Sequence, residues 1–350
     1  MRIDTPKNIA WPARGRAGIV LVVLLLILAG AGWYAYADYR HFGSTPLAPL
    51  AETTTIDVPL GTPLAGVLRL VEQRGVRTGN PWYWRALARE LGVAGKLHAG
   101  EYALNPGTTP LELLRRMAAG DVVQHRVTIV EGWTFKQLRS ALAQDPVLLQ
   151  TVTTLDDGEI MSKLGAPGAL AEGWFLPETY SFVKGMSDLD VLRRAHDDMA
   201  KLLDRLWSGH PADFVLDSPY QLLTLASIVE KETAQPAERP QIAAVFLHRL
   251  RLHMLLQTDP SVIYGLGARY DGKIHRRDLD ADTPYNTYTR AGLPPTPIAL
   301  PGKAALEAVM HPAETDALYF VARGDGTHEF SKTLDAHNQA VARFQLHQNR

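Results

Sequence analysis

The 350-residue chain contains no cysteine, which excludes disulfide bonds, thiol catalysis and cysteine-based metal sites. Its formal net charge of −1 at pH 7 gives it no excess of positive charge for a polyanion, so we expect no nucleic-acid partner. Three catalytic motifs are also missing: the Gly-x-Ser-x-Gly elbow, the His-Glu-x-x-His zinc helix and the phosphate-binding Gly-Lys-Ser/Thr loop. Enzyme classes that depend on these motifs are therefore disfavoured.

The 12 histidines are scattered along the chain. His311, His328 and His337 fall near its C-terminal end, but their spacing is not that of metal ligands. We therefore expect neither a metal site nor a cofactor.

One long hydrophobic run is present near the start. The stretch from Ala17 to Ala37 has no charged residue and is long enough to cross the hydrocarbon core of a membrane. Four basic residues precede it: Arg2, Lys7, Arg14 and Arg16. The positive-inside rule then places residues 1–16 in the cytoplasm and the remainder of the chain across the membrane.

A cleaved signal peptide is the competing interpretation, because Ala35-Tyr36-Ala37 resembles a processing site. The apolar stretch is longer than a usual signal core, and bulky aromatic residues crowd that site. These two features favour a single-pass membrane anchor that spans residues 17–37.

The composition after the anchor predicts three segments. Residues 38–54 are rich in Gly, Ser, Thr, Pro and Ala without periodicity, and indicate a short tether. Residues 55–123 alternate strand and helix signals and predict a small α+β module, which serves either as a spacer or for binding. Residues 124–350 form the larger folded part, so the expected fold class is α+β.

The most informative stretch is the predicted helix from Asp217 to Thr233. Its apolar residues recur at three- and four-residue spacing, and the next position on that face is Glu232. Burial disfavours a carboxylate, so Glu232 is expected to have a raised pKa and to hold a proton near neutral pH, as a general acid must. Glu230 lies about 200° around the helix and cannot share that face.

Two further segments carry polar and aromatic residues that suit a sugar. Gln257 to Gly265 and Tyr285 to Tyr288 mix amides, hydroxyls and tyrosines, and Gly292 to Ile298 is a stiff, proline-rich stretch. Aromatic faces stack on sugar rings while amides and hydroxyls pair with ring substituents; a peptide groove would use similar residues. The loop Glu172 to Tyr180 is expected to form a wall of a site. One acidic group beside a cleft that suits a sugar indicates an enzyme that cleaves a glycosidic bond.

Three blocks in this order carry a resemblance to a known family: Ala226 to Thr233, Leu256 to Gly265, and Tyr285 to Tyr288 followed by Gly292 to Pro295. The chain resembles the MltG (YceG-like) family of endolytic murein transglycosylases. Glu172 to Phe175, His311-Pro312 and His337-Asn338 also match.

The resemblance implies an inner-membrane enzyme with a periplasmic LysM-like module at residues 55–123 and a catalytic domain at residues 124–350. Such enzymes cleave the bond between N-acetylmuramic acid and N-acetylglucosamine within nascent peptidoglycan strands. The muramic C6 hydroxyl attacks in place of water and leaves a 1,6-anhydro end, which terminates glycan elongation. The resemblance also matches the family's catalytic residue to Glu232. Peptidoglycan synthases are the partners that we expect for an enzyme that ends strand elongation.

Around Glu232 we expect a group of candidate substrate-binding residues: Trp174, Glu230, Gln257, Thr258, Asp259, Tyr264, Tyr285, Asn286 and Tyr288. Among these, we expect Glu230 either to form a structural ion pair or to support the site from behind. The alternative from another class is a non-catalytic, membrane-tethered peptidoglycan-binding scaffold, in which Glu232 would be a structural carboxylate.

Overall fold

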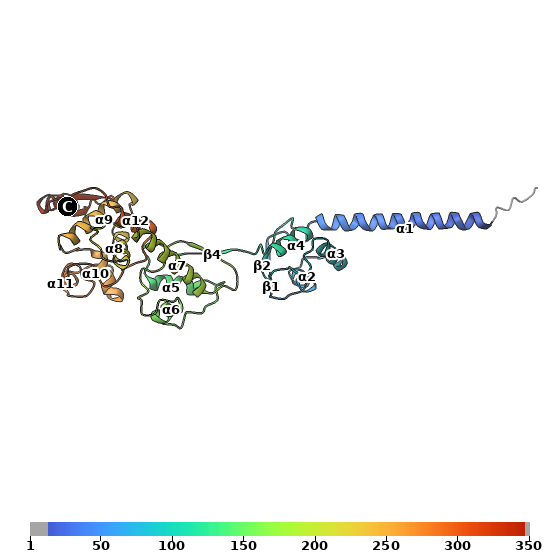
Figure 1. The fold of residues 1–350 in the computed structure, drawn as a ribbon, viewed down its shortest axis with the longest axis horizontal. Helices are drawn as coiled ribbons and strands as arrows, with labels where there is room; N and C mark the ends of the chain where they lie inside the picture. Colours follow the sequence, from blue (N-terminus) through green and yellow to red (C-terminus); the bar gives the residue numbers. More distant parts are fainter. Residues whose placement is uncertain (1–12, 347–350) are drawn as a thin grey trace, which may run out of the picture. The chain divides into compact units, whose positions relative to one another are not determined.

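A computed structural model of the chain describes residues 13–346 (Figure 1). The chain divides into two compact units, Met1–Val123 and Gln124–Arg350. The expected cytoplasmic segment, residues 1–16, lies mostly outside the described residues.

The first unit is a long helix followed by a small α+β module. Its elements are α1 (Ala13–Ser44), β1 (Thr54–Val58), α2 (Leu64–Gln73), α3 (Pro81–Glu90), β2 (Gly100–Leu104) and α4 (Pro110–Ala119). Strands β1 and β2 pair antiparallel, with Thr54 opposite Leu104 and Val58 opposite Gly100. Trp84 and Tyr102 are fully buried between this sheet and the helices.

Local sequence signals explain where these helices begin and end. The Asn80 side chain accepts a hydrogen bond from the backbone N–H of Trp82, and Pro81 occupies the first turn of α3. Thr109 caps α4 in the same way, and Gly120 ends that helix in the left-handed conformation at φ 67°. The module therefore has the strands and helices that the sequence predicts.

Helix α1 is longer than the expected anchor. Within Gly18–Ser44, the most apolar stretch of 18 residues has a mean hydropathy of 2.4, and none of that stretch is buried in the structure. These properties suit a single membrane span, although a signal sequence has the same properties.

The expected tether at residues 38–54 differs from the structure, because α1 continues to Ser44. The Tyr83 hydroxyl donates to Asp38 at 2.8 Å, and Phe42 packs edge-on against Trp84 with ring centroids 5.7 Å apart. Leu47 is also buried. The spacing of Tyr39, Phe42 and Leu47 places apolar side chains against the module, which composition alone did not reveal.

The second unit contains mostly helices, together with two short pairs of antiparallel strands. Its elements are β3 (His125–Thr128), α5 (Phe135–Gln144), α6 (Asp157–Lys163), β4 (Thr179–Phe182), α7 (Asp188–Trp207), α8 (Pro219–Glu232), η1 (Pro236–Glu238), α9 (Arg239–Arg251), α10 (Asp259–Leu266), η2 (Gly267–Arg269), α11 (Arg276–Asp280), α12 (Lys303–Met310), β5 (Tyr319–Ala322), β6 (His328–Ser331), α13 (Leu334–Val341) and the π-helical turn η3 (Ala342–Leu346). In the β5–β6 pair, Ala322 lies opposite His328.

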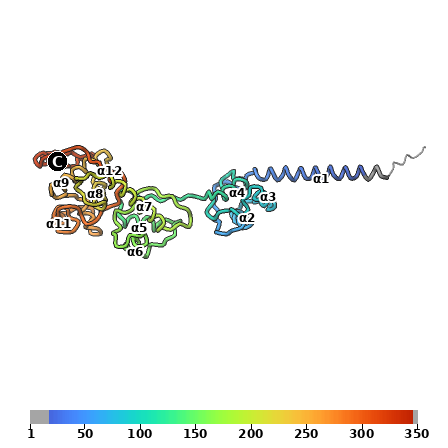
Figure 2. The backbone as a smooth tube through the Cα atoms, viewed as in Figure 1, coloured from blue at the N-terminus to red at the C-terminus, as the bar shows by residue number. Residues whose placement is uncertain are grey.

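Two hydrophobic cores stabilise this unit, and α7 contributes to both. The N-terminal half of α7 packs with α5, α6 and the β3–β4 pair, and its C-terminal half packs with α8, α9 and α12. The backbone trace shows α7 between these two groups of helices (Figure 2). Phe175 is buried in the first core and Phe246 in the second. The coarse prediction of a mixed α+β fold with an apolar N-terminal helix is confirmed.

Candidate active site

Helix α8 carries the candidate acid at its last residue. The Ser218 side chain accepts from the backbone N–H of Gln221, and Pro219 is the first helical residue, as expected. Every residue from Leu222 to Val229 is buried, so the apolar surface is wider than the single stripe that the spacing suggested. Because helices α7, α9 and α12 surround α8, the helix is a central element that ends beside a cavity.

The carboxyl of Glu232 is partly buried where α8 ends. The Thr258 hydroxyl donates a hydrogen bond to its Oε1 atom. Burial raises the pKa of Glu232 to about 7, and the charge of Asp259 adds to this rise, while the Thr258 hydrogen bond, the charge of Arg249 and the charge that His328 carries when it is protonated oppose it. The raised pKa expected from the sequence is therefore present, and near neutral pH the group exchanges a proton readily.

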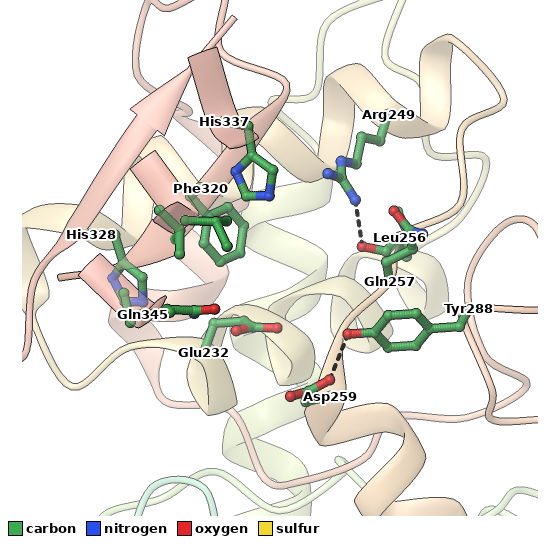
Figure 3. Close-up of a pocket in the computed structure, with 13 residues that line it drawn as sticks. Glu232, Arg249, Leu256, Gln257, Asp259, Tyr288, Phe320, His328, His337 and Gln345 are labelled. Carbon is green, nitrogen blue, oxygen red and sulfur yellow. Dashed lines mark hydrogen bonds between the residues drawn. The ribbon is translucent and has the colours of Figure 1, made fainter. Parts of the chain in front are cut away.

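Glu232 opens on a cavity of about 420 Å³. Side chains from α9, α10, the β5–β6 hairpin and the C-terminal helices line it: Arg249, Leu256, Gln257, Asp259, Tyr288, Phe320, Val321, Ala322, His328, His337, Val341 and Gln345. In the view of Figure 3, Glu232 lies between His328 on one side and the Asp259–Tyr288 pair on the other. The Tyr288 hydroxyl donates to Asp259 at 2.5 Å. Three predicted binding residues, Gln257, Asp259 and Tyr288, thus share the cavity with Glu232.

Two other predicted residues support this cavity from behind. Thr258 is buried and, besides its bond to Glu232, donates its backbone N–H to the Thr287 hydroxyl oxygen at 3.0 Å. Asn286 is also buried, and its amide nitrogen donates to the carbonyls of Asp278, Leu279 and Ala281. Asn286 therefore shapes the loop after α11 and does not line the cavity.

Tyr264 and Tyr285 line a different cavity, of about 820 Å³, on the α5 and α6 side of α10. The Tyr264 hydroxyl donates to Glu172 at 3.0 Å, and the backbone N–H of Phe135 donates to the other oxygen of Glu172 at 2.9 Å. Burial raises the pKa of Glu172 to about 7, against these two hydrogen bonds, which lower it. The prediction that these tyrosines share one cleft with Glu232 is not met, because α10 carries Asp259 and Tyr264 to its opposite ends.

The remaining two predicted residues line neither cavity. The Glu230 side chain is only 5% exposed, pairs with Arg239 at 3.1 Å and accepts the backbone N–H of Gly302 at 3.0 Å. Glu230 is thus a buried ion-pair residue, which is the structural role that its helix position suggested. Trp174 packs in the core, with its ring 6.2 Å from Tyr220.

Sequence reasoning did not identify Arg249, Phe320 or His328 as neighbours of Glu232. Arg249 is buried and donates to the carbonyls of Leu318 and Leu256, which joins the β5–β6 hairpin to the loop before α10. His328 starts strand β6. Phe320 and His328 lie in the β5–β6 hairpin, and no sequence signal placed that hairpin over the end of α8.

Comparison with known proteins locates the chain in a family. The model of the YceG-like family matches residues 56–343. The chain belongs to the YceG-like family. An endolytic murein transglycosylase of Bacillus subtilis is 30% identical over 91% of this chain and 91% of its own length. A protein of the same name from Streptococcus pneumoniae is 26% identical over 93% of this chain and 64% of its own length.

A YceG-like protein of Listeria monocytogenes provides a structural relative. It is 31% identical, superimposes with a TM-score of 0.52, and the match covers 82% of this chain and 99% of that one. In this member of the YceG-like family, residues 13–346 contain no group of three or more His, Asp or Glu side chains placed to hold a metal ion. The functional groups that line the cavity are carboxyl, hydroxyl, imidazole, amide and guanidinium groups.

Proposed function

We propose that this chain is an endolytic murein transglycosylase that cleaves the bond between N-acetylmuramic acid and N-acetylglucosamine inside peptidoglycan strands. The main observation behind the proposal is that the carboxyl of Glu232, at the end of α8, has a pKa of about 7 and lines a polar cavity. The names of the B. subtilis and S. pneumoniae relatives support it. No cofactor is required for this chemistry.

Protonated Glu232 transfers its proton to the glycosidic oxygen as the bond to C1 breaks. The C6 hydroxyl of the muramic residue attacks C1 and leaves a 1,6-anhydro end. The Glu232 carboxylate then accepts the proton of that hydroxyl, so one residue serves as acid and base in turn. Because the substrate supplies the nucleophile, the second carboxylate of ordinary glycosidases is not needed.

The groups around Glu232 bind the strand in this proposal. Gln257 and the Asp259–Tyr288 pair offer amide, carboxylate and hydroxyl groups to the sugar, and Thr258 holds the acid in place. Tyr264 and Tyr285 belong to the second cavity and contact the strand only if it extends beyond the cavity of Glu232.

We also propose how the first unit serves this activity. The apolar part of α1, up to about Ala37, anchors the enzyme in the inner membrane with the N-terminus in the cytoplasm, and the remainder works in the periplasm beside peptidoglycan synthases, where it ends strand elongation. The order β1, α2, α3, β2 supports a LysM-like module that binds glycan.

The test is mass spectrometry of products released from purified, uncrosslinked glycan strands by the full-length chain in detergent. We expect internal fragments with 1,6-anhydro ends, which disappear in Glu232→Gln. Glu230→Gln is the matched control on the same helix, and we expect it to give the same products. The assignment is reversed if Glu230→Gln is inactive and Glu232→Gln active.

Two other results point elsewhere. Reducing-end products would mean that water is the nucleophile, and Asp259 would become the second carboxylate to test. Strands retained on immobilised protein without any product, for both the native chain and Glu232→Gln, would favour the non-catalytic peptidoglycan-binding scaffold.

A further inference from the structure

A carboxylate and an imidazole form a pair across the cavity from Asp259. The Nδ1 atom of His328 lies 2.7 Å from Oε2 of Glu238, and the backbone N–H of His328 donates to Oε1 at 2.9 Å. The two side chains are only 12% and 13% exposed. Glu238 ends the η1 turn that follows α8, so it reaches His328 from the same stretch of chain that carries Glu232. His328 is thus held by two hydrogen bonds to one carboxylate, one from its ring and one from its backbone.

This pairing fixes the tautomer and the orientation of the ring. A carboxylate accepts, so the neutral imidazole carries its hydrogen on Nδ1 and keeps a free lone pair on Nε2. The ring stands edge-on to Phe320, with centroids 5.5 Å apart and an interplanar angle of 89°, which limits its rotation. Among residues 13–346, Nε2 has no hydrogen-bond partner. Because His328 lines the cavity, Nε2 is the nitrogen available to a ligand there.

We propose that His328 is a second catalytic residue of this site, the base that accepts the proton of the attacking hydroxyl, and that Glu238 is its positioning residue. The inference rests on the proposed function and reassigns one of its two proton transfers. The C6 oxygen forms its bond to C1 while its hydrogen passes to Nε2 of His328. The C1–O bond to the leaving sugar breaks, and the leaving oxygen takes the proton of Glu232. Water in the cavity returns the proton from the imidazolium to the Glu232 carboxylate before the next turnover.

Separate groups for the two transfers remove a constraint on the mechanism. A single Glu232 must give up its proton to the leaving oxygen before it can accept the proton of the C6 hydroxyl. With His328 as the base, Glu232 acts only as the acid and the second transfer does not depend on its protonation state. A carboxylate that holds Nδ1–H and leaves Nε2 free is the arrangement by which other enzymes make histidine a general base.

The charges around His328 come from several elements. Glu238 on η1 contacts His328 directly. The cavity that His328 lines is also lined by Glu232 on α8, Arg249 on α9, Asp259 on α10, Tyr288 and His337. Burial raises the pKa of Glu238, but its hydrogen bonds with His328 outweigh that and hold the pKa below its usual value, so Glu238 stays ionised and able to hold the ring. Burial, together with the charge of Arg249, lowers the pKa of His337, which leaves it neutral.

The experiment measures anhydro-product formation by the full-length chain in detergent as a function of pH. The native chain is expected to give a bell-shaped profile, since activity requires neutral His328 and protonated Glu232. In His328→Asn the amide nitrogen still donates to Glu238, but Nε2 is lost. We expect kcat/KM to fall by about 10²- to 10⁴-fold and the acid limb to disappear, while the alkaline limb remains. Added imidazole is expected to restore part of the rate in His328→Ala.

His248→Gln is the matched control. The His248 Nδ1 atom lies 3.2 Å from the Ala317 carbonyl, so this histidine also ties the chain just before β5 to α9, but it does not line the cavity. We expect its profile to keep both limbs. If His328→Asn and His328→Ala keep both limbs at a uniformly lower rate, and imidazole restores nothing, the pair only ties the hairpin and the proposal is wrong. Failure of the proposed function itself would look different, because the native chain would then release no anhydro products.

Discussion

At the scale of single residues, the reactivity of Glu232 depends on the balance of a few contacts. Burial and Asp259 raise its pKa, whereas the Thr258 hydroxyl lowers it by donating to the carboxylate form. Helix position alone indicated the burial. The opposing hydroxyl lies 26 residues further along the chain, and its contact is a product of the tertiary fold.

Thr258→Val tests this balance. Valine has nearly the same shape but cannot donate, so the carboxylate loses one stabilising hydrogen bond and the pKa of Glu232 should rise further. Glu232 must be protonated to act as the acid, so the alkaline limb of the pH–rate profile should move to higher pH. The measurement is kcat/KM for strand cleavage between pH 5 and 9. A limb that stays in place or moves to lower pH would contradict the assigned role of this hydroxyl. Thr315→Val, at a half-buried position that does not line the cavity, is the control.

At the scale of elements, the sequence predicted those whose local signals are strong. The apolar spacing of α8 and the strand and helix signals of the first unit were sufficient, because such signals are local. Short helices such as α6, α10 and α12 have too few turns to show a period, and they form because the larger fold packs them. The sequence placed Gln257, Asp259, Tyr264 and Tyr285 in one cleft with Glu232. In the structure the two ends of α10 face different cavities, so Gln257 and Asp259 line the cavity of Glu232 and the two tyrosines line the other.

The loop between α6 and β4 depends on a close backbone contact at Gly173. Its φ is +87°, and an added Cβ would lie 2.6 Å from the Pro297 ring. Gly165 has a similar φ of +90° but nothing within 4 Å of the added Cβ, so it provides a matched control. Gly165→Ala should cost about 1–2 kcal/mol of unfolding free energy from backbone strain alone. Gly173→Ala should cost about 2 kcal/mol more, because overpacking against Pro297 adds to the same strain.

Chemical denaturation of the two variants measures this difference. Equal costs would mean that the chain relaxes around Pro297 and that the contact does not hold the loop. A larger cost at Gly173, with the product pattern retained, would show that the loop stabilises the unit without taking part in the chemistry.

Glu172 joins the same loop to α5 and α10, and its protonation couples that junction to pH. Its folded pKa, about 7, is higher than the value of 4.5 for an exposed glutamate, so the folded state binds more protons than the unfolded state between these values. The stability that it contributes is therefore present below pH 4.5 and is lost as the pH rises through 7. Glu172→Gln cannot ionise. Relative to the native chain, its free energy of unfolding should rise by on the order of 3 kcal/mol from pH 4.5 to pH 8.

Urea unfolding at several pH values measures this change, and the exposed Glu314→Gln is the control. A difference between Glu172→Gln and the native chain that stays constant with pH would contradict the raised pKa. A rise of the same size in the control would assign the effect to the net charge of the unit and not to this junction.

At the scale of the whole molecule, α1 has two functions along one helix. Its apolar part is fully exposed in the structure and suits a lipid environment, whereas its last turns belong to the core of the first unit. Tyr39 donates to Glu90 at 2.5 Å and Phe42 packs on Trp84. The composition of residues 38–54 suggested a tether, because a few apolar side chains that dock on a module do not make a segment hydrophobic on average.

Two truncations separate these functions. Removal of residues 1–37 takes away the apolar span and leaves the docked turns, so the fragment should leave the membrane fraction and keep the stability of the first unit. Removal of residues 1–44 also exposes the faces of Trp84 and Leu87 that Phe42 and Gly43 cover, and should lower that stability by about 2–4 kcal/mol. Hydrogen exchange followed separately in α4 and α8 measures the two units. We expect the loss in α4 alone, since α8 lies in the other unit with its own core. Equal protection of α4 in both fragments would make residues 38–44 the tether that their composition suggested.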